Sequence, residues 1–337
     1  MPESPHDKLF KEAFGDPFNA AAELRSVLPA TILAQADLET LSPLPGSFVD
    51  EALSGFESDL LYSLRVAGSD TLLYVLFEHK SQPDRWSGFQ LLRYIVRIYE
   101  RCLAATPAPE HLPLVIPVLV HHSNGEFRYS TDFATLLDPA LDRLPDLAAY
   151  VPRFRFFLDD ISGATDAELR QRAFNSFGSL AVLFLRDARS PERFLARLPA
   201  WADLLHRLFC APDGRRALTL LFHYIYSASQ LDRDSLRSAV RRAIPPAEEL
   251  IMTLAEQLQQ EGFQQGLQQG RELGLEQGRE LGLELGRRRL LLELLEGRFG
   301  QLTEKARARL ESADEQALQR YAQRLLTAGS LDDVFAG

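Results

Sequence analysis

Two neighbouring runs decide the fold of this chain: FESDLLYSLRV at residues 56–66 and TLLYVLFEHK at residues 71–80. Side chains of the first run alternate between two faces, which is typical of a half-buried strand. One face carries Leu60, Tyr62, Leu64 and Val66, and the other carries Asp59, Leu61, Ser63 and Arg65. The second run is almost wholly apolar over residues 72–77, which is typical of a strand covered on both faces. Gly68 and Ser69 between the runs predict a two-residue hairpin turn.

This turn fixes which residues of the two strands face each other. Leu61 then faces Leu76, and Asp59 falls directly opposite Glu78. The Cβ atoms of such a pair lie roughly 4.5–5.5 Å apart, a separation at which two carboxylates can share one divalent cation. Lys80 points to the same face as Glu78 because strand side chains alternate. The sequence therefore predicts a cluster of Asp59, Glu78 and Lys80.

These residue types suit metal-dependent phosphodiester chemistry. Two carboxylates bind Mg²⁺, or a similar cation such as Mn²⁺ or Ca²⁺, through oxygen. Such a cation polarises a phosphoryl oxygen and lowers the pKa of a bound water. Lys80 can orient that water or stabilise the charge of the transition state. The alternative makes Asp59 and Glu78 exposed strand-end carboxylates with Lys80 as their surface partner, because a one-residue change in the turn would break the pairing.

Six motifs follow one another along the chain. They are His6-Asp7 with Phe10-Lys11, Val27-Leu28-Pro29, Ser58-Asp59-Leu60-Leu61-Tyr62, Glu78-His79-Lys80-Ser81 with Pro83-Asp84, Leu92-Arg93-Tyr94, and Leu114-Val115-Ile116-Pro117. Together they resemble the Rpn (YhgA-like) family of transposase-like proteins and recombination-promoting nucleases, a branch of the PD-(D/E)XK nuclease superfamily. The resemblance covers roughly residues 5–240 and is strongest over 5–125.

The resemblance implies an α/β fold in which helices flank a mixed sheet of the restriction-endonuclease type. It makes Asp59 and Glu78 metal ligands and Lys80 the lysine of the superfamily motif. Many relatives carry Gln at the position of Lys80, so this chain has the fuller form, which favours an active site. The family further implies a role in recombination or in the processing of mobile elements.

Composition limits the class of protein. The chain has 337 residues, of which 46% are hydrophobic and 25% charged, with a mean hydropathy of −0.14, as expected for a globular protein of two domains. No apolar run approaches the roughly 20 residues of a membrane span, and the N-terminus has no secretory signal pattern. Cys102 and Cys210 lie far apart and are predicted to be buried free thiols. We therefore expect a cytoplasmic protein with no membrane contact.

The net charge of −10 counts against a broad DNA-binding surface, since duplex-binding proteins usually have a basic footprint. A local basic surface is available on a helix predicted from Trp86 to about Leu103. Its arginines recur every four residues, at Arg93, Arg97 and Arg101. This ridge is either a solvated helix face or a contact to the phosphate backbone of DNA.

The same helix has an apolar set that predicts its core face. The set consists of Phe89, Leu92, Val96, Tyr99 and Leu103. Gln90 and Tyr94 are further candidates to line the site, because the helix directly follows the strand that carries Glu78.

The first 30 residues predict one or two short helices, interrupted at Gly15-Asp16-Pro17. Asp7 or Glu12 could supply a further acidic group near the metal, as first-helix acids do in related nucleases. The alternative is that Asp7 caps its helix.

The remaining elements of the first domain are predicted more coarsely. They are a loop over 42–50 leading into a strand near Ser47–Leu53, a buried strand over Pro113–Val120, a strand over 153–158, and helices from Ala167 to about Ser238. His121 and His122 are predicted to start a loop. Adjacent strand residues point to opposite faces, so these two histidines are poor joint ligands for one metal.

A row of glycines distinguishes the C-terminal third. They recur every four residues, at Gly262, Gly266, Gly270, Gly274, Gly278, Gly282 and Gly286. Each glycine costs a lone helix about 1 kcal/mol against alanine, so the row is either a flexible linker or a helix that admits a partner helix closely. We favour self-association as a homo-oligomer, with any supercoil right-handed because the period of four exceeds 3.6. The Gln, Glu and Arg residues between the glycines exclude membrane dimerisation.

The sequence thus predicts a nuclease domain at 1–245, a glycine-rich helix or linker at 246–288 and a small helical domain at 289–337. The predicted function is a metal-dependent DNA endonuclease, with Mg²⁺ as the first choice of cation. Two alternatives stay open. One is a catalytically weak oligomeric nucleic-acid-binding or regulatory protein, and the other is an RNase or toxin-like nuclease with the same site.

Overall fold

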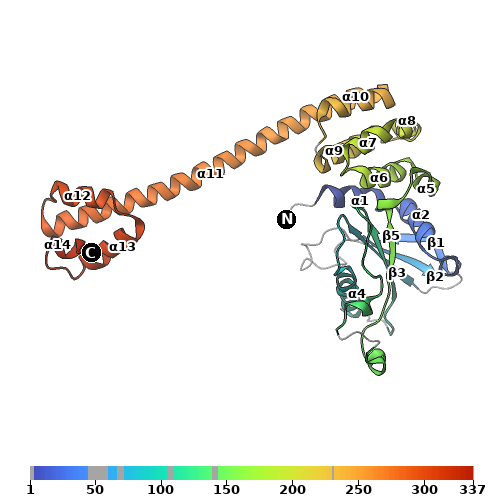
Figure 1. The fold of residues 1–337 in the computed structure, drawn as a ribbon, viewed down its shortest axis with the longest axis horizontal. Helices are drawn as coiled ribbons and strands as arrows, with labels where there is room; N and C mark the ends of the chain where they lie inside the picture. The colour runs from blue at the N-terminus through green and yellow to red at the C-terminus, as the bar shows by residue number, and fades with distance from the viewer. Residues whose placement is uncertain are drawn as a thin grey trace. The chain divides into compact units, whose positions relative to one another are not determined.

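The structure is a computed structural model of the chain and describes residues 4–44, 60–66, 72–104, 110–138, 143–229 and 231–336. The chain divides into two compact units, Met1–Ala255 and Glu256–Gly337 (Figure 1). The first unit holds a sheet and the helices around it, and the second is wholly helical.

A mixed five-stranded sheet forms the centre of the first unit. Its strands are β1 (Ala36–Pro43), β2 (Leu60–Val66), β3 (Leu72–Lys80), β4 (Leu114–His121) and β5 (Phe157–Asp160). They lie in the order β1-β2-β3-β4-β5, with antiparallel pairs at β1–β2 and β2–β3 and parallel pairs at β3–β4 and β4–β5. Helices flank this sheet, which confirms the predicted α/β fold of the restriction-endonuclease type.

The register between β2 and β3 is the one predicted from the sequence. Leu61 pairs with Leu76, and the pairs from Leu60–Phe77 to Arg65–Leu72 follow the same register. The turn at Gly68 and Ser69, and Asp59 itself, lie outside the described residues. The predicted pairing of Asp59 with Glu78 therefore stays a prediction.

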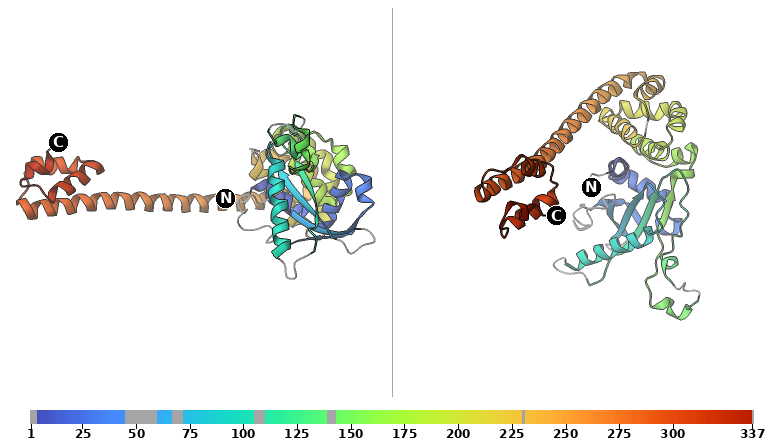
Figure 2. Two further views of the ribbon diagram at one scale, coloured as in Figure 1. Left: turned by 90° about the horizontal axis from the view of Figure 1, so that it is seen from below. Right: turned by 60° about the vertical axis from the view of Figure 1, so that its left-hand side comes forward.

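The two faces of the sheet are covered by different helices (Figure 2). Helix α4 (Ser87–Ala104) packs its Leu91 and Ile98 on one face, against Leu76 of β3 and its neighbours. Helix α1 (Pro5–Phe14) covers the other face, where Phe10 stacks on His79 at 4.9 Å between ring centroids. Because Leu61 lies under α4, β2 is buried on both faces at that point rather than on one.

Local sequence explains how the chain enters the fold. Ser4 caps α1, and Pro5 occupies the first turn, where a missing N–H costs nothing. Gly15 ends α1, and Asp16 caps α2 (Pro17–Val27), which confirms the predicted interruption. The helix α3 (Ala30–Leu33) then leads into β1.

Two sequence predictions for the first unit were wrong, and one strand was missed. A strand, β1, occupies 36–43 ahead of the predicted loop, whereas the predicted strand near Ser47–Leu53 lies outside the described residues. Strand β5 begins at Phe157, later than predicted, since the preceding Arg155 forms only an isolated bridge with Asp132. Cys210 is exposed rather than buried, while Cys102 is buried as predicted, and both are free thiols.

The helices predicted from Ala167 onward are confirmed. They are α5 (Asp166–Gln171), α6 (Ser176–Asp187), α7 (Pro191–Arg197), α8 (Ala202–Cys210), α9 (Gly214–Ala228) and α10 (Arg233–Ala243). Helix α6 is buried along its whole length from Gly178, because α1, α5, α7, α8 and α9 pack around it.

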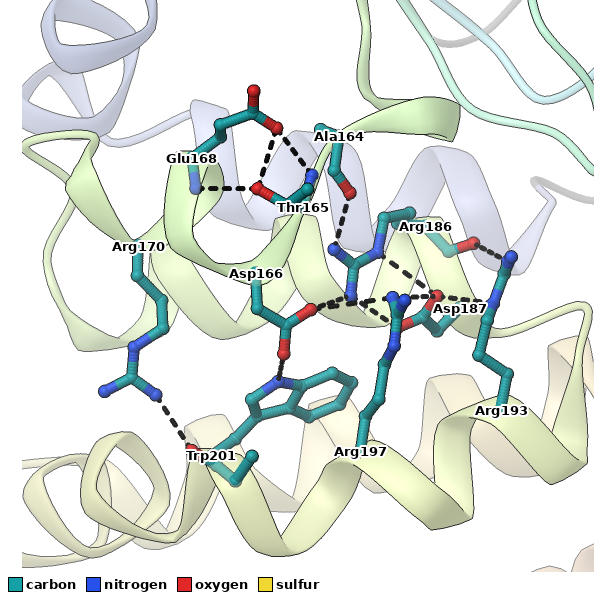
Figure 3. Close-up of polar contacts among 11 residues, drawn as sticks. Ala164, Thr165, Asp166, Glu168, Arg170, Arg186, Asp187, Arg193, Arg197 and Trp201 are labelled. Atoms are coloured by element: carbon teal, nitrogen blue, oxygen red, sulfur yellow. Dashed lines mark hydrogen bonds and ion pairs between the residues drawn. The ribbon is translucent and has the colours of Figure 1, made fainter.

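An ion network joins α6 to its neighbours (Figure 3). The guanidinium of Arg186 donates to Asp187 at 2.6 Å and to Asp166 at 2.6 Å, and both Arg186 and Asp187 are buried. Trp201 donates its indole N–H to the other oxygen of Asp166 at 2.7 Å. The network therefore links the start of α5, the end of α6 and the turn before α8 through the buried Arg186 and the partly exposed Asp166.

The second unit is built on the part of α11 (Glu248–Phe299) that follows Ala255, and this single helix contains the whole glycine row. The linker alternative is therefore wrong. The helices α12 (Glu304–Glu311), α13 (Glu315–Leu325) and α14 (Leu331–Phe335) pack against the last turns of α11. Their shared core includes Leu291, Leu295, Leu310, Leu318, Tyr321, Leu325, Val334 and Phe335. In the parts of the chain that the structure describes, no helix has the length and apolar character needed to cross a membrane.

Candidate active site

Glu78 and Lys80 lie together near the end of β3, on the face covered by α4. The Nζ atom of Lys80 is 3.2 Å from Oε1 of Glu78. Glu78 is almost completely buried, with 1% of its surface exposed, whereas the Lys80 side chain is partly accessible. A buried carboxylate beside an accessible ammonium is not the exposed strand-end pair of the alternative interpretation.

Gln90 of α4 bridges the two charged groups. Its amide nitrogen donates to Oε1 of Glu78 at 2.8 Å, and its amide oxygen accepts from Lys80 at 2.5 Å. The same nitrogen donates to the hydroxyl of Tyr94, one turn later, at 3.1 Å. The structure thus brings together Glu78, Lys80, Gln90 and Tyr94, all of which were singled out from the sequence.

The register of α4 on the sheet explains why these two side chains reach the site. The predicted core face was wrong, since Phe89, Val96 and Leu103 are about half exposed. The buried side carries Ser87, Gly88, Gln90, Leu91, Tyr94, Ile95, Ile98 and Cys102. Both sets recur every three or four residues, so the helix is apolar on two sides, and only the sheet decides which side is buried.

The described part of the site offers one carboxylate oxygen to a cation but not a complete set of ligands. The second carboxylate oxygen of Glu78, Oε2, is buried and has no hydrogen-bond partner among the described residues. An unpartnered buried oxygen of this kind is costly unless something binds it. Within the described ranges, no three His, Cys, Asp or Glu side chains could together hold a metal ion. Asp59 is the predicted second ligand and lies outside those ranges.

Asp7, the first-helix acid, does not join this cluster. Its carboxylate oxygen Oδ1 lies 3.1 Å from Nδ1 of His79, and His79 points to the face of β3 opposite Glu78. The other oxygen of Asp7 accepts from the hydroxyl of Ser4, which is the true cap of α1. The prediction of Asp7 as an acid near the metal was therefore wrong, and so was the alternative that Asp7 caps the helix. Glu12 is exposed on α1.

A buried histidine cluster lies on that opposite face and was missed by sequence reasoning. His79 and His122 stack at 4.8 Å between ring centroids, and His6 lies 5.0 Å from His122. His6 also shares a hydrogen bond of 2.9 Å with the hydroxyl of Tyr224. His121 ends β4, one residue later than predicted, and His122 begins the loop that follows, as predicted; both side chains are buried.

We expect this cluster to make the first unit sensitive to acid. Burial, with the nearby His79, lowers the pKa of His6 from 6.5 to about 4, and burial likewise holds the pKa of His122 well below its usual value. The unfolded chain takes up these protons first, so folding stability falls as the pH drops from 6.5 toward 4. Urea unfolding at pH 7 and pH 5, followed by tryptophan fluorescence, measures the loss. His122→Phe should show a smaller difference between the two pH values, and an unchanged difference would contradict the assignment.

A second acidic cluster is occupied by an arginine. Arg172 donates to Asp159 at 2.6 Å and to Glu23 at 3.0 Å, and both carboxylates are buried. Burial and the neighbouring Asp159 raise the pKa of Glu23 well above its usual value. Since Arg172 already supplies the positive charge that these carboxylates need, this cluster joins α2 to β5 and is not a second cation site.

The arginine ridge of α4 lies on the accessible side of the helix. Arg93 and Arg101 are exposed, and Arg97 is partly exposed, with its guanidinium 2.8 Å from Glu100. All three follow Gln90 on α4, so the ridge runs from the end of the helix nearest the Glu78–Lys80 cluster toward its other end. Its role in DNA binding stays a prediction.

Comparison with known proteins shows the family of the chain. The model of a family described as "Putative transposase, YhgA-like" matches residues 4–211. The chain belongs to this YhgA-like family. The matched segment contains the whole sheet, α4 and every residue of the Glu78–Lys80 cluster.

The relatives of this chain include proteins named as nucleases and a protein named as inactive. The "Recombination-promoting nuclease RpnD" of Escherichia coli O157:H7 is 31% identical over 77% of this chain and 95% of its own length. The "Recombination-promoting nuclease RpnA" of Escherichia coli (strain K12) is 31% identical over 77% of this chain and 85% of its own length. The "Inactive recombination-promoting nuclease-like protein RpnE" of the same strain is 28% identical over 77% of this chain and 83% of its own length. No solved structure matches the chain.

Proposed function

We propose that the chain is a metal-dependent DNA endonuclease that acts in recombination or in the processing of mobile elements. The observation that carries the proposal is the buried Glu78 carboxylate, with one oxygen unpartnered and the other shared by Lys80 and Gln90. Two relatives that are 31% identical are named recombination-promoting nucleases, which supports the same chemistry and DNA as substrate.

Each residue of the cluster has a role in this proposal. Glu78 and the predicted Asp59 would hold a divalent cation, Mg²⁺ first and Mn²⁺ or Ca²⁺ otherwise. A cation bound there would supply Lewis-acid activation of the phosphodiester and a more acidic bound water. The Lys80 ammonium stabilises negative charge on the phosphoryl oxygens. Gln90 holds Glu78 and Lys80 in a fixed relation, and Tyr94 fixes Gln90 in turn.

The test is nicking of a supercoiled plasmid with Mg²⁺, Mn²⁺, Ca²⁺ or EDTA, beside a structured RNA of similar length. We expect open-circular plasmid with a divalent cation and none with EDTA. Cleavage of RNA alone would favour an RNase. A folded protein that cuts neither substrate would favour a regulatory protein, an alternative supported by the relative named inactive.

We further propose that α11 joins copies of the chain. A Cβ atom built at Gly266, Gly270, Gly274, Gly278, Gly282 or Gly286 meets no other atom of the described chain within 4 Å. Leucines between these glycines, including Leu273, Leu275 and Leu281, are more than half exposed. A groove of about 670 Å³ adjoins these leucines, and it is lined by Leu281, Leu283 and Leu318 together with charged residues of α11 and α13. The seven glycines of the row destabilise an isolated helix, and close packing against a partner helix would offset that cost.

A double substitution separates this proposal from an isolated helix. We expect Gly274→Leu with Gly278→Leu to dissociate the oligomer, because two side chains would stand where the partner helix approaches. Sedimentation equilibrium measures the change in mass. Glu276→Leu introduces the same leucine side chain two residues away, on another side of α11, and should leave the mass unchanged. A wild-type monomer at micromolar concentration, or an unaffected double variant, would contradict the proposal.

A further inference from the structure

Two exposed aromatic rings lie at the end of α4 nearest the catalytic cluster, one directly before the helix and one in its first turn. Trp86 has 54% of its surface exposed and Phe89 has 48%. We propose that Trp86, assisted by Phe89, is a stacking platform for an unpaired base, so that the substrate is DNA with single-stranded character. The proposal rests on the proposed nuclease function and specifies the substrate of the same site.

The position of Trp86 links it directly to the cluster. The backbone N–H of Gln90 donates to the carbonyl oxygen of Trp86 at 2.9 Å, so Trp86 lies one helical turn before Gln90. Side chains four residues apart on a helix are neighbours, roughly 5–6 Å apart at Cβ. A base stacked on Trp86 would therefore have its phosphate close to the Gln90–Lys80–Glu78 cluster.

The turn before α4 holds the backbone of Trp86 in place and leaves about half of its surface exposed. The carboxylate of Asp84 accepts from the backbone N–H of Trp86 at 2.8 Å, and the hydroxyl of Ser87 donates to the Asp84 carbonyl at 2.8 Å. The guanidinium of Arg85 lies over one face of the Trp86 ring, 5.2 Å from its centroid, so a base would stack on the other face. A ring with a fixed backbone and an adjacent guanidinium has the features by which proteins bind single strands, where bases stack on aromatic and cationic groups.

Charge along α4 fits a nucleic acid. Residues 84–101 contain four arginines and two acids, a net charge of +2, whereas the whole chain has a net charge of −10. The arginines Arg93, Arg97 and Arg101 continue from the aromatic end along the helix at intervals of about 6 Å, given a rise of about 1.5 Å per residue. A strand with a base on Trp86 could contact this ridge through its phosphates.

A second copy of the chain fits this surface less well. Trp86, Phe89, Val96 and Leu103 are spaced like one seam of a helix pair. Arg93 and Glu100 occupy the intervening seam positions, and burying them between two helices would desolvate both charges. A duplex is also a poorer partner for Trp86 than a single strand, because its bases are stacked inside the helix and must be extruded to reach a ring.

The fluorescence of Trp86 tests the proposal directly, because Trp201, the other of the two tryptophans, is buried. We expect titration of the full-length protein in EDTA with oligo(dT) to quench tryptophan fluorescence. Trp86→Ala should remove the quenching and weaken binding to oligo(dT) about tenfold, measured by anisotropy of a labelled oligonucleotide. Trp86→Phe should recover most of the affinity. Leu103→Ala, at the far end of the same exposed side, should bind as wild type does.

Each other outcome overturns the platform. Wild-type affinity of Trp86→Ala for oligo(dT), or a loss that is equal for oligo(dT) and for a blunt duplex of the same length, would show that no base stacks on Trp86. A lower oligomer mass of Trp86→Ala, with DNA binding unchanged, would assign the surface to a second copy. Plasmid nicking by wild type is scored separately, so the nuclease function can stand when the platform fails.

Discussion

We expect Glu78→Gln to lower the rate of plasmid nicking at least about a hundredfold, the scale seen when a group that stabilises transition-state charge is removed. The amide that replaces the carboxylate keeps its size and can still accept from Gln90 Nε2. It removes the negative charge and the unpartnered oxygen through which Glu78 would bind a cation. The loss should appear with Mg²⁺, Mn²⁺ and Ca²⁺ alike, because the ligand itself is altered.

Lys80→Ala should cause a comparable loss through a different step, by removing the ammonium that faces the phosphoryl group. Glu293→Gln makes the same carboxylate-to-amide change at an exposed position of α11 and should nick as wild type does. Thermal melts of all variants show whether a loss of nicking comes from unfolding. If the folded wild type, Glu78→Gln and Lys80→Ala all nick the plasmid equally, the active site does not include Glu78 and Lys80.

The part of the site that lies on β3 could be predicted because it follows from local rules. Alternation places Glu78 and Lys80 on one face, and the two-residue turn expected from the sequence predicts the register that pairs Leu61 with Leu76. Gln90 could be predicted because α4 begins seven residues after β3 ends. A short connection leaves the start of the helix beside the strand that precedes it.

The buried side of α4 could not be predicted in this way. Leu91, Tyr94 and Ile98 have the same spacing as Phe89, Leu92 and Val96, so a periodicity argument scores both sides alike. The choice depends on which helix side matches Leu61, Leu76 and Leu119 of three strands, and that match exists only in the folded sheet. The opposite side of α4 is apolar but exposed, and the proposed base stacking on Trp86 and Phe89 gives a reason for apolar residues there.

The histidine cluster was out of reach for a related reason. His6, His79 and His122 come from three elements that lie far apart in the sequence, and their rings meet only when α1 covers the sheet. The sequence instead draws attention to adjacent histidines such as His121 and His122. Their rings have different neighbours, since His121 packs against Phe127 and His122 against His79.

The largest effect on stability should come from Asp187, the buried acid of the ion network (Figure 3). Its carboxylate is completely buried and faces Arg186, Arg193 at 2.8 Å and Arg197 at 3.3 Å. Asp187→Ala leaves the buried Arg186 guanidinium with Asp166 as its one acidic partner among the described residues. Removing one member of a buried ion pair costs about 3–5 kcal/mol, so we expect a loss of that size in the unfolding free energy of the first unit.

Both tryptophans lie in this unit, so urea unfolding followed by fluorescence reports on it separately from the helical second unit. Asp203→Ala provides the matched control. Asp203 also binds arginines, Arg170 at 2.5 Å and Arg207 at 3.0 Å, but half of its side chain is exposed. Exposed pairs contribute about 0–1 kcal/mol, so the two aspartates should differ severalfold although each contacts more than one arginine. Equal losses would mean that burial does not set the strength of the network, and that the helices around α6 are held by their apolar contacts alone.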